Sequence, residues 1–247
     1  MGNRKVNVGD VFYPKEGGEC EVVKYNNSYD VEVRFKDSGY VKSFQSSHII
    51  RGLISDPNHP RLLGVGYLGV GKYSYKEHKE ACIAWRGAIV RGHCNIYKKK
   101  RLTYKDCYVC DEWHNFQVFA DWYCNHESYG LGYHLDKDLL VKGNKVYSPD
   151  TCTMIPNHLN KLIGDNYKKD GDLPLGVTVS GKKYKARLNH REGNIYLGVF
   201  ENAGDAANAY AKAKESLVRK EAEKLKGTID KRAFESLRNW RLLPETN

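Results

Sequence analysis

The sequence predicts an α+β protein that is divided into several small domains. Its 247 residues suit one large domain or two to three small ones. Short alternating strands dominate the first fifty residues, a central segment has the order strand, turn, strand, helix, and a third segment has three strands before a long helix. We therefore expect a small β-barrel, a helical plus ββα unit, and a three-stranded sheet with a packed helix, in this order.

The expected boundaries follow changes in composition and periodicity along the chain. They are residues 1–52 for the barrel, 53–74 for a linker, 75–165 for the central ββα unit with its preceding helices, 166–226 for the sheet with its helix, and 227–247 for a C-terminal helix.

The balance of charges favours a polyanionic partner. Forty Lys and Arg against thirty Asp and Glu give a net charge of +10, and the surplus lies mostly between residues 53 and 226. Nucleic acid is the first partner to expect and an anionic membrane the second. No apolar run approaches the roughly 20 residues that span a bilayer, so no membrane is predicted. The N-terminus lacks an apolar signal-peptide core, and seven scattered cysteines favour a reducing, cytoplasmic compartment.

The first fifty residues show strand periodicity. Tyr29, Val31, Val33 and Phe35 alternate with charged residues, which is typical of a half-buried strand. Four or five short strands in this length resemble a small barrel of the Src-homology-three or Tudor type. Packing or docking of a protein partner is the preferred role for this barrel, and direct contact with nucleic acid is the alternative.

Two helices are expected before the ββα unit. Residues 75–97 carry Trp85 and Ile89 at helical spacing, and residues 111–123 carry an aromatic stripe that is expected to be core. A basic run between the helices is either a solvated loop or a phosphate-contacting loop. It consists of Lys98, Lys99, Lys100 and Arg101.

The central segment predicts two strands and a helix. The first strand is expected over 133–140, a turn over 142–145, a returning strand from Val146, and a helix over 156–163. This order is the outline of a ββα-metal nuclease unit.

At these residues the sequence resembles phage-encoded HNH-type homing endonucleases. The matching pieces are Leu135-Asp136-Lys137-Asp138, the stretch from Gly143 to Cys152, Asn157 with Asn160, and the aromatic residues between Trp113 and Trp122. The resemblance covers about residues 75–165 and implies a divalent ion, Mg²⁺ or Mn²⁺, held by an acidic residue of the first strand. It implies Asp136 as that ligand and Asn160 on the helix, with His158 nearby.

The position of the water-activating residue departs from the family pattern. Lys137 stands where the family usually has a His, and an unperturbed Lys titrates near 10.4, which makes it a poor base near neutral pH. His134 lies two residues before Asp136, on the same strand face, and is our own alternative for the base. An active nuclease and a degraded nuclease that keeps DNA binding both remain open.

Cys107 and Cys110 have the spacing of half a zinc site. No second Cys-x-x-Cys pair completes it, so ordinary buried thiols are the preferred interpretation and structural zinc is the alternative. The side chains available to complete a site are Cys124, His126, Cys152 and His158.

The third segment predicts a sheet with one cationic face. Strands are expected over 175–179, 182–189 and 195–200, and a helix from about 203 to 225 with Asn202 as its cap. A period of two places Lys183, Lys185 and Arg187 on one face of the middle strand and Tyr184, Ala186 and Leu188 on the other. The apolar face can pack on the helix, which leaves the cations in a row on the open face.

This segment resembles the ethylene-response-factor (apetala-two-like) DNA-binding domain. The residues that carry the resemblance are Gly176-Val177, Lys183 to Arg187, Tyr196 to Phe200 and Ala206 to Tyr210. In that family the sheet contacts bases and phosphates, and Tyr196 stands where Trp is frequent. The resemblance implies DNA contacts by Lys183, Lys185, Arg187, Arg191 and Tyr196; a solvated charged face is the alternative.

Together these patterns predict an HNH-like phage endonuclease that hydrolyses phosphodiester bonds of double-stranded DNA with one divalent metal. The alternative is a catalytically inactive DNA-binding or protein-docking factor, such as a phage regulator or counter-defence protein. For a phage-encoded protein the expected location is the host cytoplasm.

Overall fold

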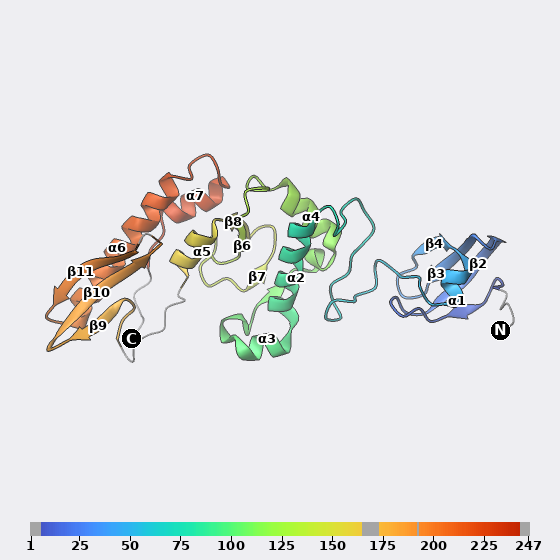
Figure 1. Ribbon diagram of the computed structural model, residues 1–247, viewed down its shortest axis with the longest axis horizontal. Coiled ribbons are helices and arrows are strands. Elements are labelled where there is room, and N and C mark those ends of the chain that lie inside the picture. The colour runs from blue at the N-terminus through green and yellow to red at the C-terminus, as the bar shows by residue number, and fades with distance from the viewer. Residues whose placement is uncertain (1–5, 165–172, 192, 243–247) are drawn as a thin grey trace. The chain divides into compact units, whose positions relative to one another are not determined.

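The structure is a computed structural model, and it has the predicted α+β class. It describes residues 6–164, 173–191 and 193–242. The described part contains seven α-helices and four small sheets (Figure 1). The chain divides into two compact units, which comprise residues 1–124 with 145–148 and residues 125–144 with 149–247. No described helix is both long and apolar enough to cross a membrane.

An antiparallel sheet forms the N-terminal part of the first unit. Its elements are β1 (Val11–Phe12), β2 (Cys20–Asn27), β3 (Asp30–Phe35) and β4 (Val41–Phe44), followed by the helix α1 (Ser46–Ile50). The strands pair in sequence order, and no pairing joins β1 to β4 among the described residues. The expected barrel is therefore an open four-stranded sheet in the part of the chain that the structure describes.

The core of this sheet follows the predicted alternation and extends beyond residue 52. Val31, Val33 and Phe35 are buried, whereas Tyr29 lies in the turn before the strand and is 76% exposed. Ile54 joins the same core, and Asp56 accepts a hydrogen bond of 2.5 Å from the Ser38 hydroxyl. The first residues of the predicted linker thus belong to this sheet.

The helices that follow residue 75 in the first unit differ from the prediction at two points: the helix expected over 75–97 is divided, and the helix expected over 111–123 is α-helical only from Phe116. They are α2 (Lys79–His93), α3 (Asn95–Lys100) and α4 (Phe116–Asn125), with 3₁₀ turns at Leu102–Tyr104 and Asp111–His114. Cys94 has an extended backbone, with ψ at 106°, and this residue divides the helix expected over 75–97. Most of the basic run is therefore helical rather than a loop, because Lys98 to Lys100 form the last turn of α3.

The aromatic stripe is core, as predicted. Trp113, Phe116 and Phe119 are buried, and the rings of Trp113 and Phe119 meet edge to face at 4.8 Å. The Trp85 indole nitrogen donates a hydrogen bond of 2.8 Å to the Trp113 carbonyl. This bond joins α2 to the segment that leads into α4.

The strand predicted to return at Val146 has another partner. The strand β7 (Val146–Tyr147) pairs in parallel with β5 (Tyr108–Val109), so it belongs to the first unit. Arg91 on α2 donates a hydrogen bond of 2.8 Å to the Tyr147 hydroxyl and lies over its ring. These contacts draw residues 145–148 out of the expected hairpin.

The ββα order survives with a later second strand. The strand β6 (His134–Asp136) pairs antiparallel with β8 (Thr153–Ile155), and the helix α5 (Asn157–Ile163) follows directly. A long connection that contains β7 separates the two strands. The predicted strand of eight residues is thus only three residues long, because the chain turns at Asp136.

The C-terminal sheet and helix agree with the prediction. The elements are β9 (Val177–Ser180), β10 (Lys183–His190), β11 (Gly193–Phe200), α6 (Ala203–Glu223) and α7 (Lys231–Arg238). The strands are antiparallel with β10 in the centre. The Asn202 side chain accepts a hydrogen bond of 2.8 Å from the Asp205 backbone and caps α6 as expected.

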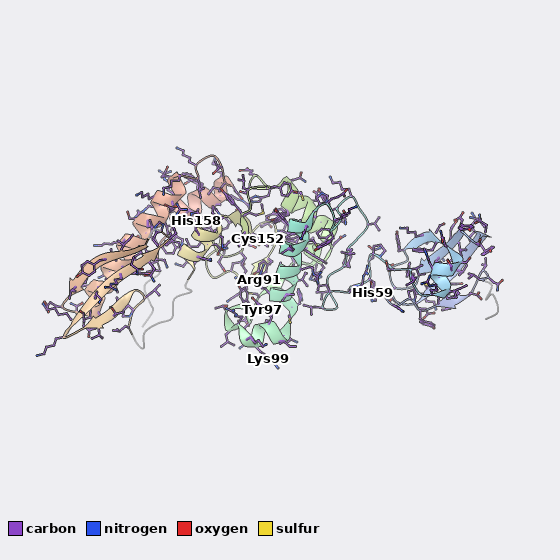
Figure 2. All side chains as sticks on the ribbon, viewed as in Figure 1. His59, Arg91, Tyr97, Lys99, Cys152 and His158 are labelled. Atoms are coloured by element: carbon purple, nitrogen blue, oxygen red, sulfur yellow. The ribbon has the colours of Figure 1, made fainter. Side chains whose placement is uncertain are left out.

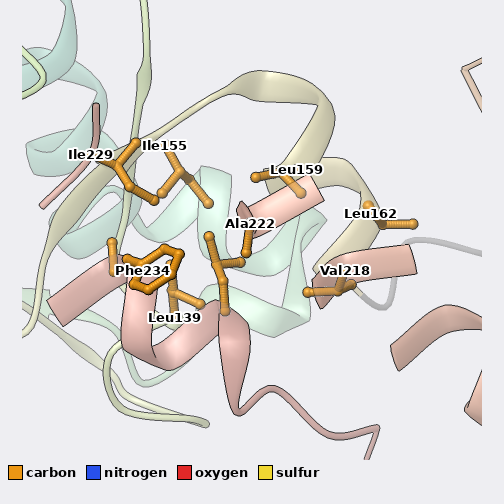
Figure 3. Close-up of a cluster of buried hydrophobic side chains, with 10 residues drawn as sticks. Leu139, Ile155, Leu159, Leu162, Val218, Ala222, Ile229 and Phe234 are labelled. Atoms are coloured by element: carbon orange, nitrogen blue, oxygen red, sulfur yellow. The ribbon is translucent and has the colours of Figure 1, made fainter. Parts of the chain in front are cut away.

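One hydrophobic core joins the ββα segment to the C-terminal helices. Residues of β8, α5, α6 and α7 form a single buried cluster (Figure 3). Its members are Leu139, Ile155, Leu159, Leu162, Val218, Ala222, Ile229, Ala233, Phe234 and Leu237. The expected boundaries at 165/166 and 226/227 therefore do not separate independent cores.

Candidate nucleic-acid interface

The open face of the C-terminal sheet carries the predicted row of cations. On β10, Ala186 and Leu188 are buried, whereas Lys183 and Arg187 are exposed and Lys185 is half-buried. The buried face packs on α6 through Ala206. The predicted division of the two faces is thus confirmed, and its cause is the strand period of two.

Cross-strand pairing places polar and apolar neighbours beside these cations. Lys185 lies opposite Thr178 of β9 and Val199 of β11, and Arg187 lies opposite Tyr196. Residues directly opposite in an antiparallel pair share a face of the sheet. Tyr196 is 61% exposed, so its ring is accessible to a partner on the open face.

A β-bulge sets the position of Tyr196. The register of β10 and β11 shifts between Ala186 and Arg187, where Leu197 is the extra residue of β11. Without this extra residue, Leu197 would lie opposite Arg187, and an apolar side chain would occupy the place of Tyr196.

Two of the predicted DNA-contacting cations, Lys183 and Arg191, form ion pairs within the protein. Lys183 Nζ lies 2.5 Å from a carboxylate oxygen of Glu201, next to the sheet. Arg191, in the turn after β10, lies 3.5 Å from Glu221 of α6. Lys185 and Arg187 are therefore the central pair of the predicted DNA contacts, and Lys183 and Arg191 are held at its edges.

The predicted basic run forms a second cationic surface in the other unit. Lys99, Lys100 and Arg101 are exposed, and Lys98 is half-buried on the same short helix. Figure 2 shows Lys99 on α3. These residues are suited to phosphate contact.

Asp136 is held by the turn that follows β6. Its Oδ1 accepts hydrogen bonds from the backbone nitrogens of Asp138, at 2.9 Å, and Leu139, at 2.7 Å. Burial raises the pKa of this carboxyl above its ordinary value, although the two backbone donors oppose that shift. The predicted metal ligand thus has a structural role that the sequence did not indicate.

Lys137 is also engaged internally. Its ammonium is buried and lies 2.6 Å from Asp138 Oδ1 and 2.7 Å from the Asn144 carbonyl. The Asn144 amide donates in return to the Lys137 carbonyl. These bonds tie the turn after β6 to the Gly-Asn turn, so Lys137 helps to close this loop.

The other predicted nuclease residues lie on β6 and α5. His134 is exposed at the start of β6, and Asn160 is half-buried on α5. His158, on the same helix (Figure 2), lies 3.3 Å from Glu221 of α6. In the described part of the chain, no group of three or more His, Cys, Asp and Glu side chains is placed to hold a metal ion.

Cys107 and Cys110, the predicted half of a zinc site, are likewise not part of a group of metal ligands among the described residues. Burial raises the pKa of the Cys110 thiol to about 11, and Cys107 is buried with its thiol 3.8 Å from the Thr103 carbonyl. The structure gathers no completing His or Cys around this pair in the residues that it describes.

Sequence reasoning missed a polar cluster around Asp230, next to Thr153 of β8. Thr153, which lies opposite Asp136, is within 3.5 Å of Asp230, and His126 lies 3.7 Å from the same carboxylate oxygen. Arg232 approaches that oxygen at 2.9 Å. The Asp230 side chain also caps α7. A helix cap at Asp230 could have been read from the sequence, but its distant partners could not.

No protein-family model, curated protein or solved structure matches the chain. Function is therefore inferred from the geometry and chemistry of the described residues.

Proposed function

We propose that this protein binds double-stranded DNA through the open face of its C-terminal sheet. The observation that carries the proposal is the row Lys183, Lys185 and Arg187, which lies on the solvent side of β10 while the opposite face is buried on α6. Lys and Arg at regular spacing neutralise phosphates and release counterions. The major groove admits a two-stranded β-ribbon such as β10 with β11, and Arg reads guanine edges there.

The test is the salt dependence of duplex binding. We expect Lys185→Ala and Arg187→Ala each to weaken binding and to lower the slope of log K against log salt by about 0.9, because each removes one phosphate neutralisation at most. Fluorescence anisotropy of a labelled duplex at several salt concentrations measures both quantities.

Lys212→Ala is the matched control, because Lys212 is exposed on α6 outside the sheet and removes the same charge from the protein. Slopes that change equally in Lys212→Ala and Lys185→Ala would reject the open face as the DNA site.

Metal-dependent DNA cleavage by an HNH-like unit is the second candidate function. The antiparallel pair β6 and β8 followed by α5 favours it, because the acidic Asp136 ends the first strand and the helix comes directly after the second. The described donors do not fit a complete Mg²⁺ or Mn²⁺ site, since Asp136 caps a turn and His158 contacts Glu221.

Nicking of supercoiled plasmid with Mg²⁺ or Mn²⁺ tests the second candidate. If the unit cleaves DNA, Asp136→Asn should lose nicking by two orders of magnitude or more while keeping its turn, because the amide oxygen still accepts both backbone hydrogen bonds. His134→Ala should also lose nicking if His134 is the base. A wild type that leaves the plasmid intact, or an Asp136→Asn variant that nicks equally well, would leave a DNA-binding protein without this activity.

A further inference from the structure

We infer that the open face reads a mixed sequence, in which A·T pairs adjoin a guanine, and does not hold any duplex equally. The inference rests on the proposed DNA binding and deepens it. Its basis is the set of side chains that share the face with the cations, because amides and methyl groups add nothing to phosphate neutralisation but discriminate between base edges.

The pairing of the strands arranges these side chains in three rows across the sheet. One row contains Thr178, Lys185 and Val199, the next contains Arg187 and Tyr196, and the third contains Asn189 and Asn194. Rows two residues apart on β10 are separated by about 6.6–6.8 Å. This spacing corresponds to about two base-pair steps, at 3.4 Å per step. A strand that lies along the groove could thus address several successive base pairs.

The asparagine row suits adenine. Asn189 and Asn194 are both exposed and lie directly opposite each other. Asn is common in turns, but these two residues lie within the paired strands, on the strand side of the His190 and Gly193 pair that closes the hairpin. The hairpin does not need them there. An Asn side chain that accepts a hydrogen bond from adenine N6–H₂ through its oxygen, and donates one to N7 through its NH₂ group, makes the bidentate contact that selects adenine.

The row at Lys185 suits thymine. Val199 is 44% exposed, and Thr178 on the other side of Lys185 also carries a methyl group. The C5-methyl group of thymine is the apolar feature of the major groove, and side-chain methyl groups contact it. Valine is also favoured in strands for its β propensity alone, so Val199 needs a comparison residue. Val179 serves as that comparison, because it is 62% exposed but lies opposite Tyr184, on the other face of the sheet.

The experiment starts with selection of duplexes from a random pool by the full-length protein. We expect a consensus with at least one guanine and adjacent A·T pairs. In that consensus site, replacing thymine by uracil removes the methyl group, and replacing adenine by 7-deazaadenine removes N7. Each replacement at a contacted base should weaken binding by about fivefold or more.

The variants assign the effects to side chains. Val199→Ala should reduce the preference for thymine over uracil, whereas the matched control Val179→Ala should keep the wild-type preference. The double variant Asn189→Ala with Asn194→Ala should lose the penalty for 7-deazaadenine and keep the preference for thymine. Circular dichroism of each variant reports whether the sheet is intact.

Four outcomes would overturn the inference. Binding without any consensus would reject base reading but leave the proposed DNA binding intact. A consensus made only of G·C pairs, or a Val179→Ala variant that loses the thymine preference as Val199→Ala does, would reject this assignment of rows. Absence of duplex binding altogether would reject both the inference and the proposed function.

Discussion

Glu221 shows how a single residue links distant parts of the second unit. Its carboxylate is 3% exposed and has cationic or protonatable neighbours from three elements: His158 of α5, Arg191 of the turn after β10, and Lys224 at the end of α6. Burial raises the pKa of Glu221, but the hydrogen bond and charge of Lys224, together with Arg191 and His158, outweigh burial and lower it overall.

The lowered pKa of Glu221 predicts an acid-sensitive contribution to stability. A carboxyl whose folded-state pKa is depressed stabilises the protein above its unfolded pKa, about 4.5 here, and loses this contribution as the pH falls through the folded value. Glu221→Gln should therefore lower the free energy of unfolding by about 1–2 kcal/mol at pH 7, a value reduced because its partners are half exposed. Urea unfolding between pH 7 and 3 should show the gap between wild type and variant narrowing with acid.

The pKa of Asp136 is shifted in the opposite direction to that of Glu221, so Asp136 serves as the comparison. Its pKa is raised by burial, so its contribution to stability is largest in acid and is lost as the pH rises through the folded value. The difference in free energy of unfolding between wild type and Asp136→Asn should accordingly not narrow as the pH falls. A constant gap for Glu221→Gln across this pH range would contradict the assigned pKa shift.

The helix α6 is the element that serves both halves of the second unit. Its first half packs on the sheet through Ala206 and Tyr210, and its second half contributes Val218 and Ala222 to the core shared with α5 and α7. Figure 1 shows the helix continuing from the sheet to α7. A continuous helix is stiff, so the C-terminal sheet and the ββα segment share one rigid support.

Close packing of α6 on the sheet predicts a strong effect at Gly176. This residue precedes β9 with φ at +76°, and a Cβ there would overlap the Tyr210 ring. Gly176→Ala should cost about 2–5 kcal/mol, from the overlap and from the left-handed backbone together. Gly181→Ala is the control, because Gly181 has φ at +65° but open space around it, and it should cost only about 1–2 kcal/mol. Equal destabilisation in thermal unfolding would show that the Tyr210 contact does not matter.

At the scale of the whole molecule, each compact unit is built from segments that are not consecutive in the sequence. The chain passes between its two compact units at three points, because residues 145–148 belong with the first unit while the residues on either side belong with the second. The pairing of β7 with β5 and the bond between Arg91 and Tyr147 account for this exchange. The central ββα segment therefore cannot be treated as a separable domain.

The shared core predicts the behaviour of a truncated protein. A fragment that ends at residue 164 would lose α6 and α7 and expose Ile155, Leu159 and Leu162, which are buried in the full chain. We expect β8 and α5 to lose amide hydrogen-exchange protection in this fragment, since burial of these side chains offsets the entropy of ordering them. The helices α2 and α4 should stay protected and serve as the internal control. Retained protection in α5 would show that the ββα segment folds alone.

Much of the candidate site was predictable where the chemistry is local. The two faces of β10, the Asn202 cap and the buried aromatic stripe follow from periodicity and capping within a few residues. The roles of Asp136 and Lys137 did not follow. Their motif resembles that of a metal site, yet their hydrogen bonds to nearby backbone atoms depend on how the following turn folds.

Local pattern alone thus determined the α+β class, the three strands and helix near the C-terminus, and which side chains of the sheet face solvent. The tertiary structure decided that β7 pairs with β5, that α6 belongs to two cores, and that His158 and Arg191 meet at Glu221. The reason is physical: strand and helix periods act between residues close in sequence, whereas the burial of a carboxylate or a shared core depends on segments that meet only when the whole chain has packed.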